Sequence, residues 1–298
     1  MDTDRQLYEA DATGWKRGLY EDVQTTFRAP VVNWIFRTLL ANEPDLTRYL
    51  WGQVKPAFET RAFGSFTLQW RDAVLSAVEG GDADLPVYRK PDHDLSPAEF
   101  AELRGQLATF DVVVPRLAVL FETVDRSLRG DSVGESPAED RAATAPLPDW
   151  LDRDRAHAPR SPTMTPFSDL DEGLSGTVEA VQSFHGFDEG LPSVYRCLAQ
   201  WPGAFERLWD DVAPVLESEA FERAVTEATD LAADYVSSLP YRPRLAPEDL
   251  RSVGVDDGTV EELRGLFETF NRGPVRTVLP AVPAFAAAFG VEGERSGL

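Results

Sequence analysis

The sequence predicts an all-α protein built from two homologous helical bundles that pack together as an intramolecular pseudo-dimer. Three observations support this prediction. Apolar residues recur at helical spacing along most of the chain, whereas strand-like alternation is never sustained. The third is a repetition: LANEPDLTRYLWGQVKP at 40–56 returns as LAQWPGAFERLWDDVAP at 198–214. Duplicated halves tend to pack about a pseudo-twofold axis through matching surfaces.

The repetition extends beyond this stretch and sets the predicted domain boundaries. Trp51 corresponds to Trp209 without a gap, and AELRGQLATF, from Ala101, recurs as EELRGLFETF, from Glu261. Chance resemblance between two helices could produce one such block. Two separate blocks in the same order are much less expected by chance, so they indicate a duplication. We therefore predict a first repeat over 1–128, a linker over 129–166 and a second repeat over 167–298.

Apolar periodicity and end signals predict the helices of both repeats. Helices are expected over 15–27, 44–58, 96–110, 218–239 and 256–270. In the first of these, Leu19, Val23 and Phe27 share one face. The third opens with Ser96 and Glu99, a signature of a helix N-terminus.

The segment between the repeats is rich in Pro, Asp, Ser and Ala and has no periodicity. Such a composition is typical of a connecting segment. We expect His157 to be solvated and Trp150 to anchor the middle of the linker by burial.

The charge balance excludes several classes of partner. The chain carries 51 acidic residues against 29 Lys and Arg, a formal net charge of −22. Such a surface repels nucleic-acid phosphates and anionic lipid. No apolar run is long enough to span a membrane, and the N-terminus is polar rather than signal-like. We expect a cytoplasmic protein without nucleic-acid or membrane partners.

Common catalytic and ligand-binding motifs are not found in the sequence. It has no glycine-rich phosphate loop, no zinc-protease motif and no hydrolase nucleophile motif. His93 between Asp92 and Asp94 is a poor coordination set and predicts a polar loop. Cys197, the one cysteine, lies in an apolar helical pattern and is expected to be buried. No metal and no cofactor are therefore expected.

Several stretches resemble the group I 2-haloacid dehalogenases, an all-helical family with a tandem repeat. They are YEDVQTTFRAPVV at 20–32, LATFDVVVPRLAVL at 107–120, LAQWP at 198–202 and GVDDGTVEELRGLFETFNRGP at 254–274. The resemblance implies hydrolysis of the carbon–halogen bond of short 2-haloalkanoic acids, without cofactor or metal. In that family an Asp acts as base on a water, and an Asn helps to hold the water.

The chain departs from the family at both of these catalytic positions. The position of the Asp falls on Val194, after Ser193, and the position of the Asn falls on Val114. Valine can neither accept a proton nor bind a water. The aromatic lining of the family is partly kept. Val31 stands where the family has a Trp, and Trp34 stands at the aromatic position three residues further on. We expect these five residues to line a dry, apolar pocket between the halves.

Other polar residues could replace the lost pair. Asp111 and its repeat partner Asn271 each lie shortly before a Pro, and they either form a relocated water-binding pair or cap and bend their helices. Asp188 and Glu189 either reach the cleft or form an exposed pair at a helix start. Arg272 could bind a substrate carboxylate or pair with a surface acid.

The sequence leaves three functions open, of which the activity of the family is the best single description. This first function is a dehalogenase-like hydrolase with a rearranged base. The second is a non-catalytic relative that binds a small organic acid or an apolar molecule between its halves. The third is a structural or partner-binding helical protein. Association into a homodimer is compatible with each of them.

The acidic, lysine-poor composition is typical of proteins from the cytoplasm of extreme halophiles, so we expect a halophilic, haloarchaeal-type protein whose fold depends on salt. Concentrated KCl shortens the range of repulsion between carboxylates to a few Å, whereas in dilute buffer the range is roughly 10 Å or more. We expect far-ultraviolet circular dichroism to show loss of helix on dialysis into salt-free buffer. Full helical content without salt would contradict the idea of a halophilic protein.

Overall fold

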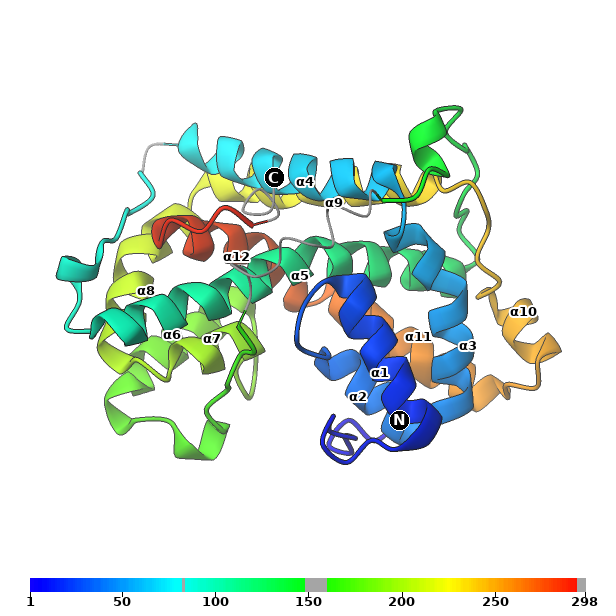
Figure 1. Ribbon diagram of the computed structural model, residues 1–298, viewed down its shortest axis with the longest axis horizontal. Helices are drawn as coiled ribbons and strands as arrows, with labels where there is room; N and C mark the ends of the chain where they lie inside the picture. The colour runs from blue at the N-terminus through cyan, green and yellow to red at the C-terminus, as the bar shows by residue number, and fades with distance from the viewer. Residues whose placement is uncertain (82–83, 148–159, 294–298) are drawn as a thin grey trace. The chain divides into compact units, whose positions relative to one another are not determined.

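The computed structural model is all-helical, as the sequence predicts (Figure 1). It describes residues 1–81, 84–147 and 160–293. Within these ranges no β-strand is present, and one isolated bridge joins Thr60 to Pro146. The α-helices are α1 (Gly14–Phe27), α2 (Trp34–Asn42), α3 (Pro44–Val54), α4 (Arg61–Glu79), α5 (Pro97–Arg129), α6 (Ser175–His185), α7 (Ser193–Leu198), α8 (Pro202–Leu216), α9 (Glu219–Ser237), α10 (Pro247–Ser252), α11 (Asp257–Arg272) and α12 (Val275–Ala288).

The helix boundaries recur along the chain in the manner that the sequence repetition predicts. Pro44 and Pro202 open α3 and α8, and Arg61 and Glu219 open α4 and α9, so both pairs are separated by 158 residues. Later in each repeat, Pro115 and Pro274 correspond. The first lies inside the continuous helix α5, whereas the second stands between α11 and α12. This recurrence supports a duplication.

The helices group into two compact units, each of which draws on both repeats. The first unit comprises Met1–Phe66, Arg116–Pro148 and Ala232–Asn271, and the second comprises Thr67–Pro115, Asp149–Leu231 and Arg272–Leu298. The first unit therefore combines α1–α3 with α11 from the other repeat. The second combines α6–α8 and α12 with the first part of α5. The repeat boundaries near residues 128 and 167 remain a prediction from the sequence.

Each unit has an aromatic core of its own. In the first unit the Phe27 ring contacts Phe36, Trp51 and Phe58 edge-on, with centroids 5.7, 5.8 and 5.1 Å apart. In the second unit Tyr195 contacts Trp209 and Phe285 in the same manner, at 6.0 and 5.6 Å. Edge-to-face pairs of this kind add to the stabilisation that burial of the rings provides.

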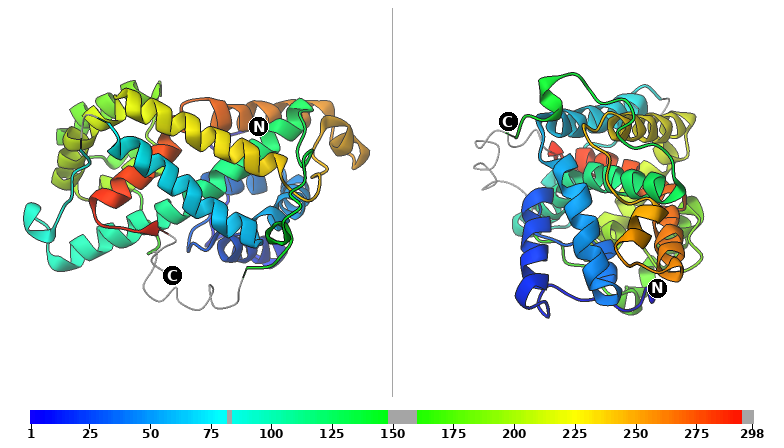
Figure 2. Two further views of the ribbon diagram at one scale, coloured as in Figure 1. Left: turned by 90° about the horizontal axis from the view of Figure 1, so that it is seen from above. Right: turned by 90° about the vertical axis from the view of Figure 1, so that its right-hand side faces the viewer.

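The second unit also contains most of two long helices, α4 and α9, which lie side by side in the left view of Figure 2. The indole Nε1 of Trp70 on α4 donates to the carbonyl of Ala228 on α9 at 3.0 Å. Trp70 is almost completely buried. This bond satisfies the one polar atom of a large side chain in the core.

The helix starts confirm the expected end signals. At the start of α5, Ser96 N donates to Glu99 and Glu99 N donates to the Ser96 hydroxyl, at 2.7 and 3.2 Å. These reciprocal bonds are a capping box. Proline occupies the first turn of α3, where its missing N–H is not needed.

The described parts of the connecting segment are bound to the helices by backbone hydrogen bonds. Gly134, Ser136 and Ala138 donate to the carbonyls of Val236, Ser237 and Ser238, each at 3.1 Å. The amide of Arg61 donates to the carbonyl of Ala145. The expectations for Trp150 and His157 fall outside the described residues.

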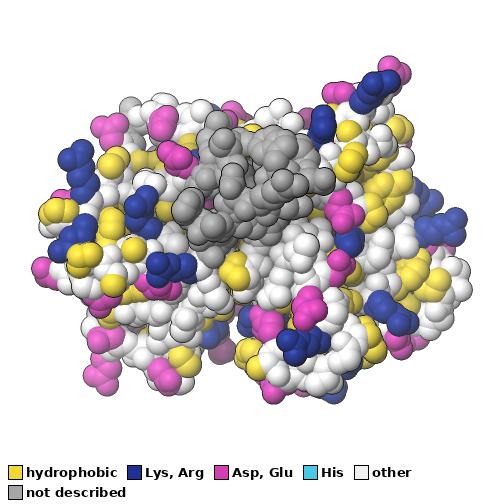
Figure 3. Space-filling view, viewed as in Figure 1, with side chains coloured by type: hydrophobic (Ala, Val, Ile, Leu, Met, Phe, Trp, Pro, Cys, Tyr) yellow, Lys and Arg dark blue, Asp and Glu magenta, His cyan; other side chains and the backbone are white. Residues whose placement is uncertain are grey.

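Charged side chains of both signs are interspersed on the face that Figure 3 shows. No helix among the described residues is both long enough and apolar enough to cross a membrane.

Gly134 is expected to resist substitution because of a close backbone contact. Its φ is +67°, and a Cβ there would lie 2.4 Å from the Tyr241 carbonyl oxygen. Gly130 also has a positive φ, +79°, but no atom lies within 4 Å of its would-be Cβ. Gly130→Ala should cost about 1 kcal/mol through backbone strain alone.

Gly134→Ala should cost more than Gly130→Ala, because it adds a steric clash to the same strain. Urea unfolding of the two variants and the parent measures the difference. Equal losses of unfolding free energy would contradict the close approach of Tyr241.

Candidate functional site

Val194 occupies a buried position in the short helix α7 of the second unit. Its side chain is 3% exposed, and Ser193, which begins the helix, is half-buried. Because equivalent positions of the two repeats are 158 residues apart, Phe36 in the first unit is the equivalent of Val194. Phe36 is fully buried and contacts Trp51 edge-on at 5.4 Å. The corresponding position of the other repeat is therefore a core position.

Val114 is equally buried, one residue before Pro115 inside α5. It is 2% exposed, and its neighbours Val112 and Val113 are 6% exposed. Both positions to which the resemblance assigns water activation therefore carry apolar side chains removed from solvent. A valine side chain offers a water neither a proton acceptor nor a hydrogen-bond partner.

Hydrogen bonds in the second unit join the two helices that carry these valines. The side-chain oxygen of Gln106 on α5 accepts from the Cys197 thiol of α7 at 3.1 Å and from Gln200 Nε2 at 2.9 Å. Cys197 is buried, as expected, and burial raises its pKa to about 12. The thiol is therefore protonated and unreactive at neutral pH.

A second buried network holds the other side of α7. His185 Nδ1 lies 2.7 Å from the Thr277 hydroxyl, and Nε2 is hydrogen-bonded to the Tyr195 hydroxyl. Thr277 donates its proton to the Pro274 carbonyl, so Nδ1 must carry a hydrogen and Nε2 must accept from Tyr195. Burial lowers the pKa of His185 to about 3, which keeps the ring neutral.

Asp111 is held in an ion pair in the second unit. Arg71 Nε lies 2.8 Å from its Oδ2, and the Asp111 side chain is fully buried. The same guanidinium donates from Nη2 to the Val291 carbonyl at 2.7 Å. Asp111 therefore lies within α5, bound to arginine, and does not cap a helix.

Asn271, the repeat partner of Asp111, lies in the first unit with other partners. Its Nδ2 donates to Glu122 at 2.8 Å and to Asp125 at 2.9 Å, both on α5. The two candidate replacements thus belong to different compact units and are bound to different side chains. Their pairing around one water remains a prediction from the sequence.

The remaining predicted site residues are distributed over both units. Asp188 and Glu189 are exposed in the loop between α6 and α7, and Arg272 is exposed at the end of α11. Trp34 stacks on Phe270 in the first unit, with centroids 5.2 Å apart. Val31 is half-buried there, whereas Val114, Ser193 and Val194 belong to the second unit. Their grouping into one pocket remains a prediction.

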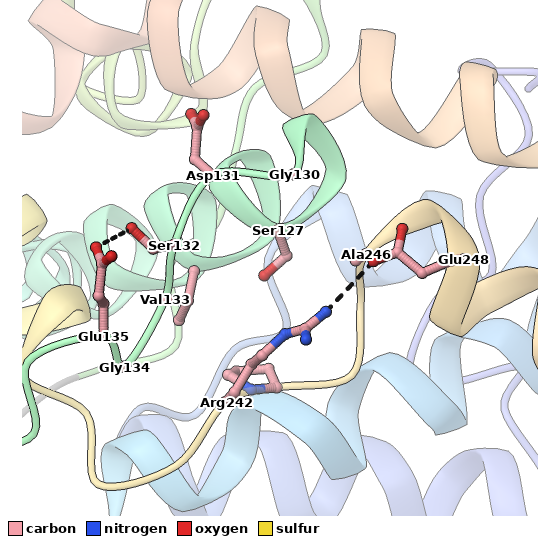
Figure 4. Close-up of a pocket in the computed structure, with 11 residues that line it drawn as sticks. Ser127, Gly130, Asp131, Ser132, Val133, Gly134, Glu135, Arg242, Ala246 and Glu248 are labelled. Atoms are coloured by element: carbon pink, nitrogen blue, oxygen red, sulfur yellow. Dashed lines mark hydrogen bonds and ion pairs between the residues drawn. The ribbon is translucent and has the colours of Figure 1, made fainter.

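One cavity of about 410 Å³ lies in the first unit, at the end of α5 (Figure 4). Its charged and hydroxyl groups already have partners. Arg242 pairs with Glu248 at 3.5 Å, and Ser132 donates to Glu135. The residues that line this cavity are not those that the sequence predicts for the site. Nor do the described residues contain a cluster of three or more acids, histidines and cysteines that could hold a metal.

Comparison with known proteins agrees with the sequence resemblance. Residues 30–172 match the family model described as halocarboxylic acid dehydrogenase DehI. An (R)-2-haloacid dehalogenase of Pseudomonas putida is 22% identical over 85% of this chain and 82% of its own length. A configuration-inverting 2-haloacid dehalogenase of Alcaligenes xylosoxydans xylosoxydans is 25% identical, over 88% and 84%.

The chain is therefore similar over most of its length to proteins named as 2-haloacid dehalogenases. Solved structures share its fold. A D-2-halacid dehalogenase mutant matches with a TM-score of 0.78 at 18% identity, over 99% of this chain and 96% of that one. A D-2-haloacid dehalogenase mutant in complex with D-2-CPA gives a TM-score of 0.77 at 19% identity over the same shares.

The residues that fix α7 in this chain could not be predicted from its sequence. Gln106 lies in the block that identifies the repeat, but its bonding partners Cys197 and Gln200 are about ninety residues away. His185 is one of three scattered histidines, with no motif around it. No local pattern marks either network, because the partners come from distant segments.

Val194→Asp tests how apolar the surroundings of residue 194 are. Burial should raise the pKa of the new carboxyl, and a pKa that is higher by about two costs about 3 kcal/mol once the group is ionised. Because the folded-state pKa is then the higher one, the loss of stability should grow as the pH rises through the unfolded pKa of about 4.

Val87→Asp is the matched control, because Val87 in the same unit is 73% exposed. Denaturant unfolding of both variants across a pH series measures the two effects. A Val194→Asp variant as stable at pH 7 as Val87→Asp would contradict the burial of this position.

Proposed function

We propose that this chain is a dehalogenase-like protein that binds a short organic acid or small apolar molecule without hydrolysing a carbon–halogen bond. The observation that carries this proposal is the pair of buried valines at positions 114 and 194. The resemblance assigns to these positions the base and the amide that activate water. A valine at either position removes a proton acceptor or a hydrogen bond that general-base catalysis requires.

The groups that could have taken over this role have other partners. The Asp111 carboxylate is bound by Arg71, and the Asn271 amide is bound to Glu122 and Asp125. Recruiting Asp111 as a base would require breaking a buried ion pair, which is costly when one charge is left uncompensated. These contacts favour binding over turnover.

The class of ligand follows from the relatives. They are named as 2-haloacid dehalogenases, and one solved relative is a complex with D-2-CPA and another a complex with L-LA. Because one fold can host different functions, a relative can bind a small acid without carrying out the chemistry of the catalysts. A cytoplasmic location and association into a homodimer remain expectations from the sequence.

Retained hydrolysis with Asp111 as a relocated base is the second candidate. It is favoured by the relatives' shared activity over more than four-fifths of this chain. It differs from the first proposal in one observable, which is the formation of a 2-hydroxy acid.

The deciding experiment incubates each enantiomer of 2-chloropropionate with the protein in concentrated KCl and measures lactate by chromatography. Lactate is the appropriate readout, because chloride in the buffer conceals chloride release. We expect no lactate above the protein-free control. We also expect 2-chloropropionate at about 100 times its Kd to stabilise the fold by about 2.7 kcal/mol.

Asp111→Asn separates the two candidates. Lactate formed by the parent and lost in this folded variant would contradict the binding proposal and support the relocated base. Absence of both lactate and saturable stabilisation would contradict both and leave a structural role.

A further inference from the structure

The side chain of Gln106 is a point at which three segments of the second unit meet. It is 2% exposed on α5. Its Oε1 accepts from the Cys197 thiol, from Gln200 Nε2 and from the Thr163 amide, at 3.1, 2.9 and 2.9 Å. An amide oxygen has two lone pairs, so three donors saturate it. Removing it would leave all three donors without this acceptor.

Thr163 belongs to a short stretch, Arg160 to Thr165, which we call the strap. Its first residue is bound to α5, where Arg160 N donates to the Gly105 carbonyl at 3.0 Å and the Thr109 hydroxyl donates to the Arg160 carbonyl at 2.6 Å. A Cβ on Gly105 would lie 2.7 Å from the Arg160 side chain, so glycine permits this close approach.

The other end of the strap is bound to α7 and its C-terminal side. Thr165 N donates to the Arg196 carbonyl at 3.0 Å, and Arg196 Nε donates back to the Thr165 carbonyl at 2.9 Å. Gln200 Nε2 also donates to the Thr163 carbonyl at 2.6 Å. The strap therefore connects α5 to α7 through the segment that joins the repeats.

Helix α7 needs such support because it has only six residues. A helix this short is not stable by itself in water, since nucleation costs more than one turn of hydrogen bonds returns. Its position must come from tertiary contacts. Tyr195 is held by His185 on one side, and Cys197 and Arg196 are held by Gln106 and the strap on the other.

We propose that Gln106 and the strap act as a latch that positions α7, and with it residue 194, against α5. Gln106 is a positioning residue, because it acts through Thr163, Cys197 and Gln200 rather than by contact with a ligand. Its importance for binding rests on the proposed function, whereas its control of α7 does not.

Cys197 makes the latch measurable, because it is the one cysteine of the chain and lies on α7. Its thiol can react with iodoacetamide only when α7 opens, locally or with the whole fold. Gln106→Ala should speed native-state labelling of Cys197 by at least about tenfold beyond what its change in global unfolding free energy explains. Urea unfolding under the same buffer conditions supplies that global value.

Two further variants define the comparison. Gln200→Ala removes the donors to Gln106 and to the Thr163 carbonyl but leaves the other latch bonds, so we expect a smaller rise. If Gln106→Ala does not fold, Gln200→Ala provides the test of the latch. Gln53→Ala removes a similar side-chain acceptor, for the Arg244 amide, in the first unit. In Gln53→Ala the rate of Cys197 labelling should change only as much as the global unfolding free energy of that variant explains.

Labelling that follows global stability alone in both latch variants would overturn the proposal, because Gln106 would then be an ordinary core residue. Faster local labelling together with at least a threefold rise in the Kd for 2-chloropropionate would support the latch and its role in binding. Faster labelling in a protein whose parent binds no 2-chloropropionate would support the latch and contradict the proposed function alone.

Discussion

The burial of α5 on both sides of Pro115 is the constraint on which both cores depend. Before the proline, Leu103, Leu107 and the Asp111–Arg71 pair belong to the second unit. After it, the helix supplies the first unit with apolar residues and with Arg116, which is 2% exposed and whose guanidinium lies over the Phe63 ring at 5.3 Å. One helix therefore has to satisfy two separate packing environments. A change of register in α5 would disturb the core of each unit.

Several polar side chains on this helix and its neighbours are bound to one another, which limits what these groups can do chemically. A carboxylate bound by arginine, an amide bound by two carboxylates and a neutral imidazole between two hydroxyls are stable arrangements. Catalysis requires a group whose partner is the substrate or a water. The helical fold is shared with the solved structures, and Val114 and Val194, the positions at which the sequence resemblance predicts water activation, are buried apolar residues.

The sequence predicted elements well where the information is local. The capping box of Ser96 and Glu99, the start of α3 at Pro44 and the helical repetition all follow from short patterns. It could not predict that α11 packs in a unit with α1–α3, since periodicity identifies a buried face but not its partner. For the same reason the partners of Asp111 and Asn271 were out of reach. Arg71 is 40 residues from Asp111, and Glu122 is 149 residues from Asn271.

The neutral state of the buried histidine has a consequence for the electrostatics of the whole protein. Only three histidines are present, and burial lowers the pKa of His185 to about 3 and also lowers that of His93. Histidine is the side chain that ordinarily titrates near neutrality. These two histidines therefore add little to the change of net charge between about pH 6 and 8. Around neutral pH the long-range field of so acidic a chain is therefore governed mainly by its many carboxylates and by the counter-ions that screen them.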